Sequence, residues 1–154
     1  MSKNQYPQKQ YVKYVPVGFV DTHSLVLAYV FWIFGFFGAH RFYLGRPLSG
    51  LLYLCTLGLL GIGWIVDLFL IPGMVQENNR RFQAGAVDYN IAWILFWLGG
   101  VLGLHRFYEG KILTGVLYLL TGGLFLIGLV YDMFTLNEQI DEVNHRGISQ
   151  FVMA

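Results

Sequence analysis

The sequence has little charge, almost no cysteine and no excess of charge of either sign. Only 12% of its 154 residues are charged, although a soluble chain carries about 25% charged residues to cover its surface. This shortage excludes an ordinary soluble domain. The single Cys55 excludes an internal disulfide or a thiolate metal site, and a net charge of +1 provides no basic field for nucleic acid.

Apolar residues are what the sequence has in excess. They make up 56% of the chain, and the mean hydropathy is +0.54. The few charged residues gather at the two ends and between the apolar stretches, so they cannot cover one continuous surface. Composition and charge placement together predict a membrane protein.

One short motif occurs twice and organises the chain. The sequence HRFYLG at residues 40–45 returns as HRFYEG at 105–110, and Asp67 and Asp132 keep the same offset, so no insertion separates the copies. Further matches continue through apolar and polar segments alike: Phe31/Phe96, Trp32/Trp97, Gly50/Gly115, Tyr53/Tyr118, Thr56/Thr121, Glu77/Glu142, Asn79/Asn144 and Arg81/Arg146. Because composition alone does not produce matches in polar segments, the chain contains an internal duplication.

The apolar stretches predict four transmembrane helices in two hairpins, at about 24–43 and 50–71, then 89–108 and 112–136. The expected divisions of the chain are a polar mobile tail at 1–20, hairpins at 21–82 and 83–147, and a C-terminal tail at 148–154. Each hairpin has two spans, so both enter the membrane in the same orientation. We therefore expect an all-α membrane protein, a four-helix bundle with pseudo-twofold symmetry.

This topology places both termini and the linker on one side of the membrane and both motif turns on the other. The termini and linker carry the larger share of the basic residues, namely Lys3, Lys9, Lys13, Arg80, Arg81 and Arg146. The turns carry Arg41, Arg46, Arg106 and Lys111. The positive-inside rule then favours cytoplasmic termini.

The motif and its surroundings resemble the TM2 domain family. The shared pattern is an apolar helix, Gly-x-His-Arg-Phe-Tyr-x-Gly, a short turn and a glycine-rich second helix with an Asp near its end. It occurs at 38–45 with Asp67 and at 103–110 with Asp132. The resemblance covers roughly 24–82 and 89–147, and it implies a two-helix membrane module with a role in interaction or signalling. It implies no catalytic residues.

This chain departs from the family pattern in two ways. Many members have Asp-Arg-Phe where this chain has His-Arg-Phe twice, and eukaryotic members typically carry a signal peptide and a longer extracellular segment. The first 20 residues are polar and show no cleavable signal. The chain therefore looks more like a bacterial member, and we expect a multi-pass protein of the bacterial inner (plasma) membrane.

The repeated motif is the candidate interaction site: His40, Arg41, Phe42, Tyr43, Gly45, His105, Arg106, Phe107, Tyr108 and Gly110. The arginines either anchor the turns at the membrane surface or recognise a lipid phosphate or a partner carboxylate. The histidines could bind a metal or haem iron if the bundle brought them together. A hydrogen-bonding role at the interface is commoner, so we expect no metal and no cofactor.

Asp67 and Asp132 are the intramembrane acidic residues. A continuous helix from Gly50 to Asp67 is about 25 Å long, which places Asp67 near the opposite membrane face from the motif. We therefore do not expect Arg41 to pair with Asp67 in the same hairpin. The aspartates either cap the bundle or relay protons or ions.

Small residues at helical spacing are the candidate helix-packing positions: Gly35, Gly38, Gly58, Gly99, Gly100, Gly103 and Gly123. They let helix backbones approach closely in lipid. That packing could lie within the bundle or between chains, as in a homo-oligomer, and the former needs no further assumption.

The leading hypothesis is a non-catalytic membrane module, because no arrangement typical of hydrolases or metalloenzymes occurs. Its exposed His-Arg-Phe-Tyr turns would bind another membrane protein or anionic lipid in the bilayer, and no nucleic acid. The alternative is a small transporter or channel whose path between the repeats is lined by Tyr53, Thr56, Tyr118, Thr121 and the aspartates.

Overall fold

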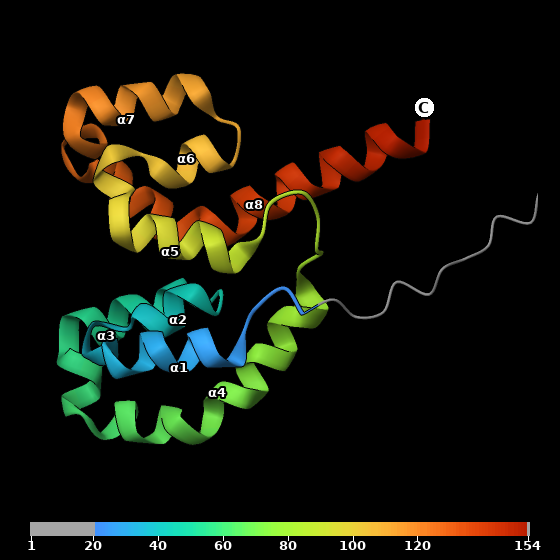
Figure 1. The fold of residues 1–154 in the computed structure, drawn as a ribbon. Coiled ribbons are helices and arrows are strands. Elements are labelled where there is room, and N and C mark those ends of the chain that lie inside the picture. The colour runs from blue at the N-terminus through green and yellow to red at the C-terminus, as the bar shows by residue number, and fades with distance from the viewer. Residues whose placement is uncertain (1–20, 154) are drawn as a thin grey trace, which may run out of the picture.

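The computed structural model describes residues 21–153, and the regular structure of that part of the chain is entirely helical (Figure 1). The expected tail at 1–20 lies outside the described residues. The first repeat contains α1 (Leu25–Ile33), η1 (Gly35–Phe37), α2 (Ala39–Tyr43), α3 (Pro47–Leu60) and α4 (Ile62–Arg81). The second contains α5 (Tyr89–Gly99), η2 (Gly100–Leu102), α6 (Leu104–Tyr108), α7 (Ile112–Phe125) and α8 (Ile127–Met153). The predicted all-α class is confirmed.

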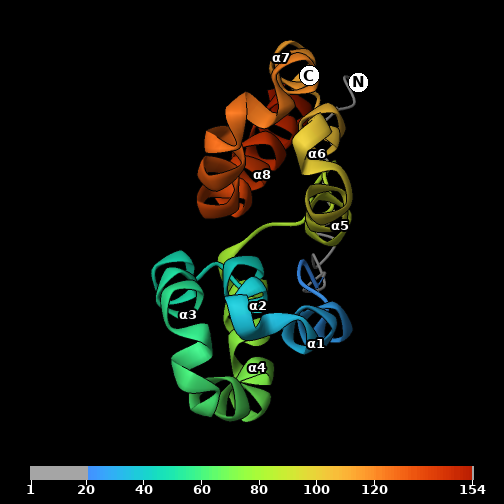
Figure 2. The same ribbon diagram turned by 90° about the vertical axis from the view of Figure 1, so that its left-hand side faces the viewer.

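The two repeats form two stacks of helices that lie against each other (Figures 1 and 2). Within each stack the chain runs to and fro, so that α1, α2, α3 and α4 alternate in direction, as do α5 to α8 (Figure 1). Helix α8 extends beyond its stack, and it reaches through most of the range expected as a C-terminal tail. The duplication seen in the sequence is thus a duplication of one four-segment unit.

Local signals explain where the first helix of each unit begins and ends. The Ser24 hydroxyl accepts a hydrogen bond from the Leu27 N–H, and the Asp88 carboxylate accepts from the N–H groups of the second and third residues after it.

The stretch expected as one helix at 24–43 breaks at Gly38, whose φ of 76° belongs to the left-handed region that favours glycine. Gly103 repeats this conformation with a φ of 74°. The expectation of continuous first spans is therefore wrong.

The stretches expected as second spans are broken as well. A left-handed segment over Leu57–Gly61 separates α3 from α4, and Gly58 lies in it. The matching segment, which contains Gly123, separates α7 from α8, and the chain bends by 117° between those two helices. Across residues 21–153, no single helix combines the length and apolarity needed to cross a membrane, and by those criteria only the bent pair α7 and α8 qualifies. The four-span layout is accordingly not confirmed.

The repeats meet through aromatic side chains and one buried amide. Phe42 packs against Phe134 with ring centroids 5.4 Å apart, and Tyr43 packs edge-on against Trp93 at 6.1 Å. The Asn137 side chain donates to the Tyr43 carbonyl at 2.9 Å and accepts from the Trp93 indole at 2.7 Å. Because the motif supplies Phe42 and Tyr43, the first motif turn is part of the junction between the repeats.

Candidate functional site

Four side chains form the first motif cluster: His40, Arg41, Tyr53 and Asp67. The Arg41 guanidinium forks onto both Asp67 carboxylate oxygens, with Nε to Oδ2 at 2.8 Å and Nη2 to Oδ1 at 2.5 Å. His40 Nε2 lies 2.6 Å from Asp67 Oδ2, and because a carboxylate can only accept, this nitrogen carries the proton. The guanidinium also lies 4.1 Å from the centroid of the Tyr53 ring and donates to its hydroxyl at 2.9 Å.

The second motif cluster consists of His105, Arg106, Tyr118 and Asp132, and it repeats the arginine fork and the His–Asp contact of the first. The His105 Nε2 to Asp132 Oδ2 distance is 2.7 Å, and Arg106 makes the same fork at 2.9 and 2.5 Å. The Arg106 guanidinium lies 4.2 Å from the centroid of the Tyr118 ring. Two bonds from a planar guanidinium to one carboxylate fix the relative orientation of the helices that carry them.

The broken helices explain how these residues meet. After Gly61 the chain reverses, so Asp67 lies in the second turn of α4 and faces the motif on α2. A straight helix from Gly50 would have carried Asp67 away from Arg41. The expectation that these two residues do not pair is therefore wrong, and the reason is the left-handed segment between α3 and α4.

The motif is buried, whereas the sequence led us to expect an exposed turn. His40, Tyr43 and His105 are completely buried, and the side chains of Arg41 and Arg106 are only 13% and 10% exposed. The turn also lies beside the start of α1 and not across the molecule from it, because the Tyr43 hydroxyl accepts from the Ser24 N–H at 2.7 Å. Both expectations about the turn are corrected by these contacts.

The remaining motif residues pack locally. The Phe42 and Phe107 rings each lie against a glycine of the following helix, where a Cβ on Gly50 or Gly115 would come within 2.9 or 2.8 Å of the ring. The Tyr108 hydroxyl accepts from the Asp88 N–H at 3.1 Å, whereas Tyr43, at the matched position, accepts from the Ser24 N–H, which lies one residue further along its repeat. Gly45 and Gly110 end the motif turns with positive φ angles.

Several predicted packing glycines make close contacts inside their own repeat. A Cβ on Gly38 would lie 2.7 Å from the Gly50 carbonyl oxygen, and one on Gly35 would lie 2.6 Å from His40 Nδ1. In the second repeat, a Cβ on Gly99 would lie 2.2 Å from Leu104. A Cβ on Gly100 would lie 2.9 Å from Leu129, and one on Gly103 would lie 2.7 Å from Tyr118. These glycines therefore allow close packing inside one chain, which is the first of the two alternatives given by the sequence.

Sequence reasoning missed residues that break the repeat symmetry. Trp32 stacks on Trp64 with centroids 4.4 Å apart and planes 3° apart, and each indole donates to the other residue's carbonyl at 2.8 Å. The residue matched to Trp64 is Leu129. It lines an apolar groove of about 370 Å³ together with Trp97 and Met133. Reading the repeats position by position for mismatches, as well as for matches, would have found this difference.

The two motif histidines are not brought together to bind a metal. Within residues 21–153, no three His, Cys, Asp or Glu side chains are placed to hold a metal ion, and His40 and His105 belong to separate clusters. Of the side chains expected to line a channel, the tyrosines and aspartates lie in the two clusters, Tyr53 with Asp67 and Tyr118 with Asp132, and the threonines do not join them. Thr56 and Thr121 donate to carbonyls of their own helices, at Leu52 and Leu117. In each repeat, the His-Arg-Asp contacts hold the motif helix against the last helix. We call these contacts the first latch (His40, Arg41 and Asp67) and the second latch (His105, Arg106 and Asp132).

Comparison with known proteins agrees with this duplicated architecture. A sequence model of the TM2 domain matches residues 21–69 and again residues 85–134, once in each repeat. The chain belongs to the TM2 domain family. No solved structure matches the chain. TM2 domain-containing proteins are membrane proteins, so membrane character and the tandem TM2 repeat are both confirmed.

Several relatives with a TM2 domain are eukaryotic proteins. A TM2 domain-containing protein of Dictyostelium discoideum is 52% identical over 62 residues, which are 40% of this chain and 40% of that protein. A second Dictyostelium protein is 58% identical over 54 residues, 34% of this chain and 39% of its own length. Human TM2 domain-containing protein 1 is 47% identical over 53 residues, 34% of this chain and 26% of its own. The chain thus matches well under half of each relative, and the expected bacterial origin has no support.

Proposed function

We propose that this TM2 chain is a non-catalytic integral membrane module that associates with another membrane protein, with its termini on the cytoplasmic side. In this proposal the duplicated His-Arg-Phe-Tyr turns shape the binding surface and do not touch the partner themselves. The observation that supports it is the internal neutralisation of each motif: one carboxylate receives one guanidinium and one imidazole N–H.

A buried arginine is free to recognise an external anion only if its donors are unoccupied. Two of the three Arg41 nitrogens, Nε and Nη2, are committed to Asp67, and Nη2 also donates to the Tyr53 hydroxyl. Arg106 is committed to Asp132 in the same way. Removing one partner of a buried ion pair leaves an uncompensated charge, which is strongly destabilising. The motif is therefore better suited to holding the fold than to exchanging partners.

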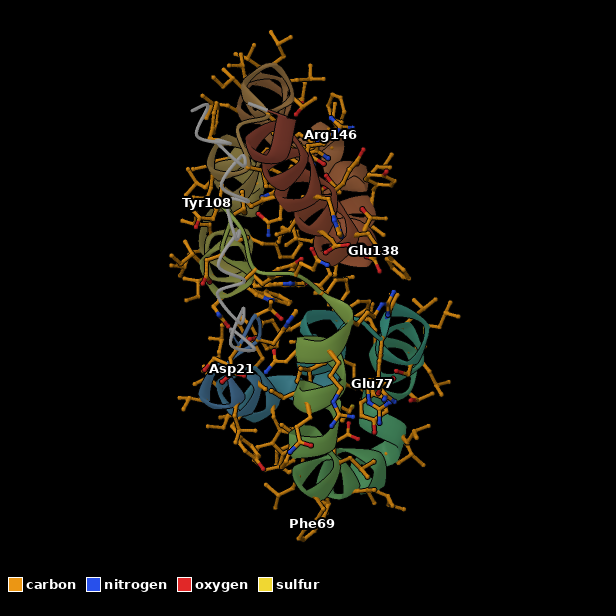
Figure 3. All side chains as sticks on the ribbon, turned by 90° about the vertical axis from the view of Figure 1, so that its right-hand side faces the viewer. Asp21, Phe69, Glu77, Tyr108, Glu138 and Arg146 are labelled. Atoms are coloured by element: carbon orange, nitrogen blue, oxygen red, sulfur yellow. The ribbon has the colours of Figure 1, made fainter. Side chains whose placement is uncertain are left out.

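The outward surface supports contact with lipid or with another membrane protein. Large apolar side chains are strongly exposed where α3 turns into α4 and α7 turns into α8: Leu60 at 86%, Phe125 at 81% and Ile127 at 76%. Phe69 of α4 is 78% exposed and projects away from the rest of the molecule (Figure 3). Large apolar side chains exposed in such number are typical of proteins that contact lipid or a partner.

The experiment is photo-crosslinking in native membranes with a reactive residue at Phe69 or at Phe125, and with one at Glu77 as a polar control position. We expect a discrete protein adduct from at least one Phe position and none from Glu77. The adduct should disappear when the two latches are broken by Asp67→Asn and Asp132→Asn at a matched membrane level. Labelling of lipid alone, or an unchanged adduct in the double variant, would contradict the proposal.

A further inference from the structure

The second repeat contains a buried carboxylate that its counterpart lacks. Glu109 directly follows α6, and its side chain is completely buried. The matched residue in the first repeat is Leu44, which is also completely buried. An apolar side chain satisfies this position without any polar partner, so the glutamate introduces a cost of burial that the fold itself does not require.

Glu109 has very little to stabilise its charge. Its Oε2 lies 2.6 Å from the Lys111 ammonium, which is an ion pair, but neither carboxylate oxygen accepts an aligned hydrogen bond from the described residues. Asp132, in the same repeat, accepts from His105, twice from Arg106 and once from Gln139. Of these two buried carboxylates, Asp132 accepts four hydrogen bonds, whereas Glu109 has one ion pair and is the one poised to take up a proton.

A chain of contacts links Glu109 to the second motif cluster. The Lys111 ammonium also donates to Gln139 Oε1 at 2.5 Å, and the Gln139 amide donates to Asp132 Oδ1 at 3.0 Å. The first repeat cannot form this chain, because Met74 stands where Gln139 does and Arg46 pairs instead with the exposed Glu77. Charge at Glu109 is therefore connected to the second latch and has no equivalent at the first.

We propose that Glu109 is a proton-binding site specific to the second repeat, and that a proton taken from water frees Lys111 from its ion pair. The carboxylate becomes a neutral carboxylic acid, and the ammonium is then held by Gln139 alone. Protonation of Glu109 changes the surroundings of the second latch and has no counterpart at Leu44 in the first repeat. This inference goes beyond the proposed association function and does not depend on it.

The groups that face Glu109 come from each element around it. Burial raises the pKa of Glu109, while Lys111, before α7, and His105, on α6, act to lower it. Asp132, on α8, acts in the same direction as burial. Burial is the largest of these effects, so the site titrates above the ordinary range of a glutamate, which is about 4.3.

The test is infrared difference spectroscopy of the full chain in detergent micelles, titrated from neutral to acidic pH. We expect a protonated-carboxyl band whose midpoint lies above that of an ordinary glutamate, because burial raises the pKa of Glu109. The band should vanish in Glu109→Gln, which preserves size and shape, and remain in the control Glu77→Gln. Lys111→Met should raise the midpoint by about one further unit, because it removes the opposing charge.

Three results would overturn the proposal: no titrating band above the ordinary glutamate range, a band that survives Glu109→Gln, or an unchanged midpoint in Lys111→Met. Glu109→Leu guards against misfolding of the glutamine variant, since it imports the residue that the first repeat already buries at this position. A folded Glu109→Leu protein that lacks the band supports the assignment. One that retains it refutes the assignment.

Discussion

The first repeat closes its outer face with two stacked indole rings, whereas the second leaves the matching face open as a groove. Both repeats nevertheless hold the same His-Arg-Asp latch to within about 0.1 Å in the bonded distances. The two copies thus differ in what surrounds the latch and agree in the latch itself. In this chain, therefore, the His-Arg-Asp contacts are common to both repeats, and the packing on the helices around them is not.

A second difference points the same way. At the position after the motif tyrosine, the first repeat buries Leu44 and the second buries Glu109. The leucine joins the core cluster, while the glutamate connects through Lys111 to Gln139. The first repeat is therefore the more completely packed copy, and the second carries the additional polar chemistry.

The largest expected effect comes from breaking either latch. Asp67→Asn and Asp132→Asn each leave a buried guanidinium without its carboxylate, so each should lower the free energy of unfolding by about 3–5 kcal/mol. The measurement is SDS-titrated unfolding in mixed micelles, followed by tryptophan fluorescence. The surface variant Glu142→Gln should change it by less than about 1 kcal/mol. A small loss at one aspartate only would show that the two latches are not equivalent.

The next effect comes from the glycine that begins each motif helix. Gly38→Ala must hold alanine at a φ of 76° with its Cβ 2.7 Å from the Gly50 carbonyl oxygen. Strain and overpacking together should cost about 3 kcal/mol. Gly103→Ala should cost nearly as much, because its Cβ would meet the Gly115 oxygen at 3.0 Å and the Tyr118 Cβ at 2.7 Å.

A substitution at Gly110 distinguishes backbone strain from overpacking as the cause of the lost stability. Its φ is also 76°, but a Cβ there would meet no atom within 4 Å. Gly110→Ala should therefore cost only the backbone strain, about 1 kcal/mol in the same unfolding measurement. Equal losses at Gly38 and Gly110 would mean that the close approach of the motif to the following helix contributes nothing.

A smaller effect tests the packed face against the open one. Trp32→Leu removes one ring of the stacked pair and an indole hydrogen bond, so it should cost about 2 kcal/mol of unfolding free energy. Trp97→Leu, at the matched position, should cost about half as much because its ring has no stacked partner in the described structure. Equal losses would show that the stack does not distinguish the repeats. Circular dichroism should confirm unchanged helix content in both variants.

The sequence predicted the all-helical class, the duplication and the importance of the motif, because these depend on composition and on matched residues. It did not predict the helix breaks. Leu57, Leu59 and Leu60 adopt positive φ angles that leucine rarely takes, so their identity gives no warning of a turn. Arg41 can reach Asp67 only because of that break, so a prediction based on a continuous helix could not include the pair. The role of Glu109 could not be predicted from the repeat, because the matched residue is Leu44 and the comparison of the two copies identifies the positions that agree.

The smallest effect concerns the position just before the first helix of each repeat, where the first copy buries His23 and the second exposes Asp88. Burial lowers the pKa of His23 from 6.5 to about 4. The unfolded chain therefore binds a proton first, and stability present above pH 6.5 is lost as the pH falls toward 4. The loss between pH 7.5 and 5.5 should be about 1 kcal/mol. His23→Gln should remove that part of the acid sensitivity, and the exposed His145→Gln should not. An unchanged pH profile in His23→Gln would show that folding does not shift the pKa of His23.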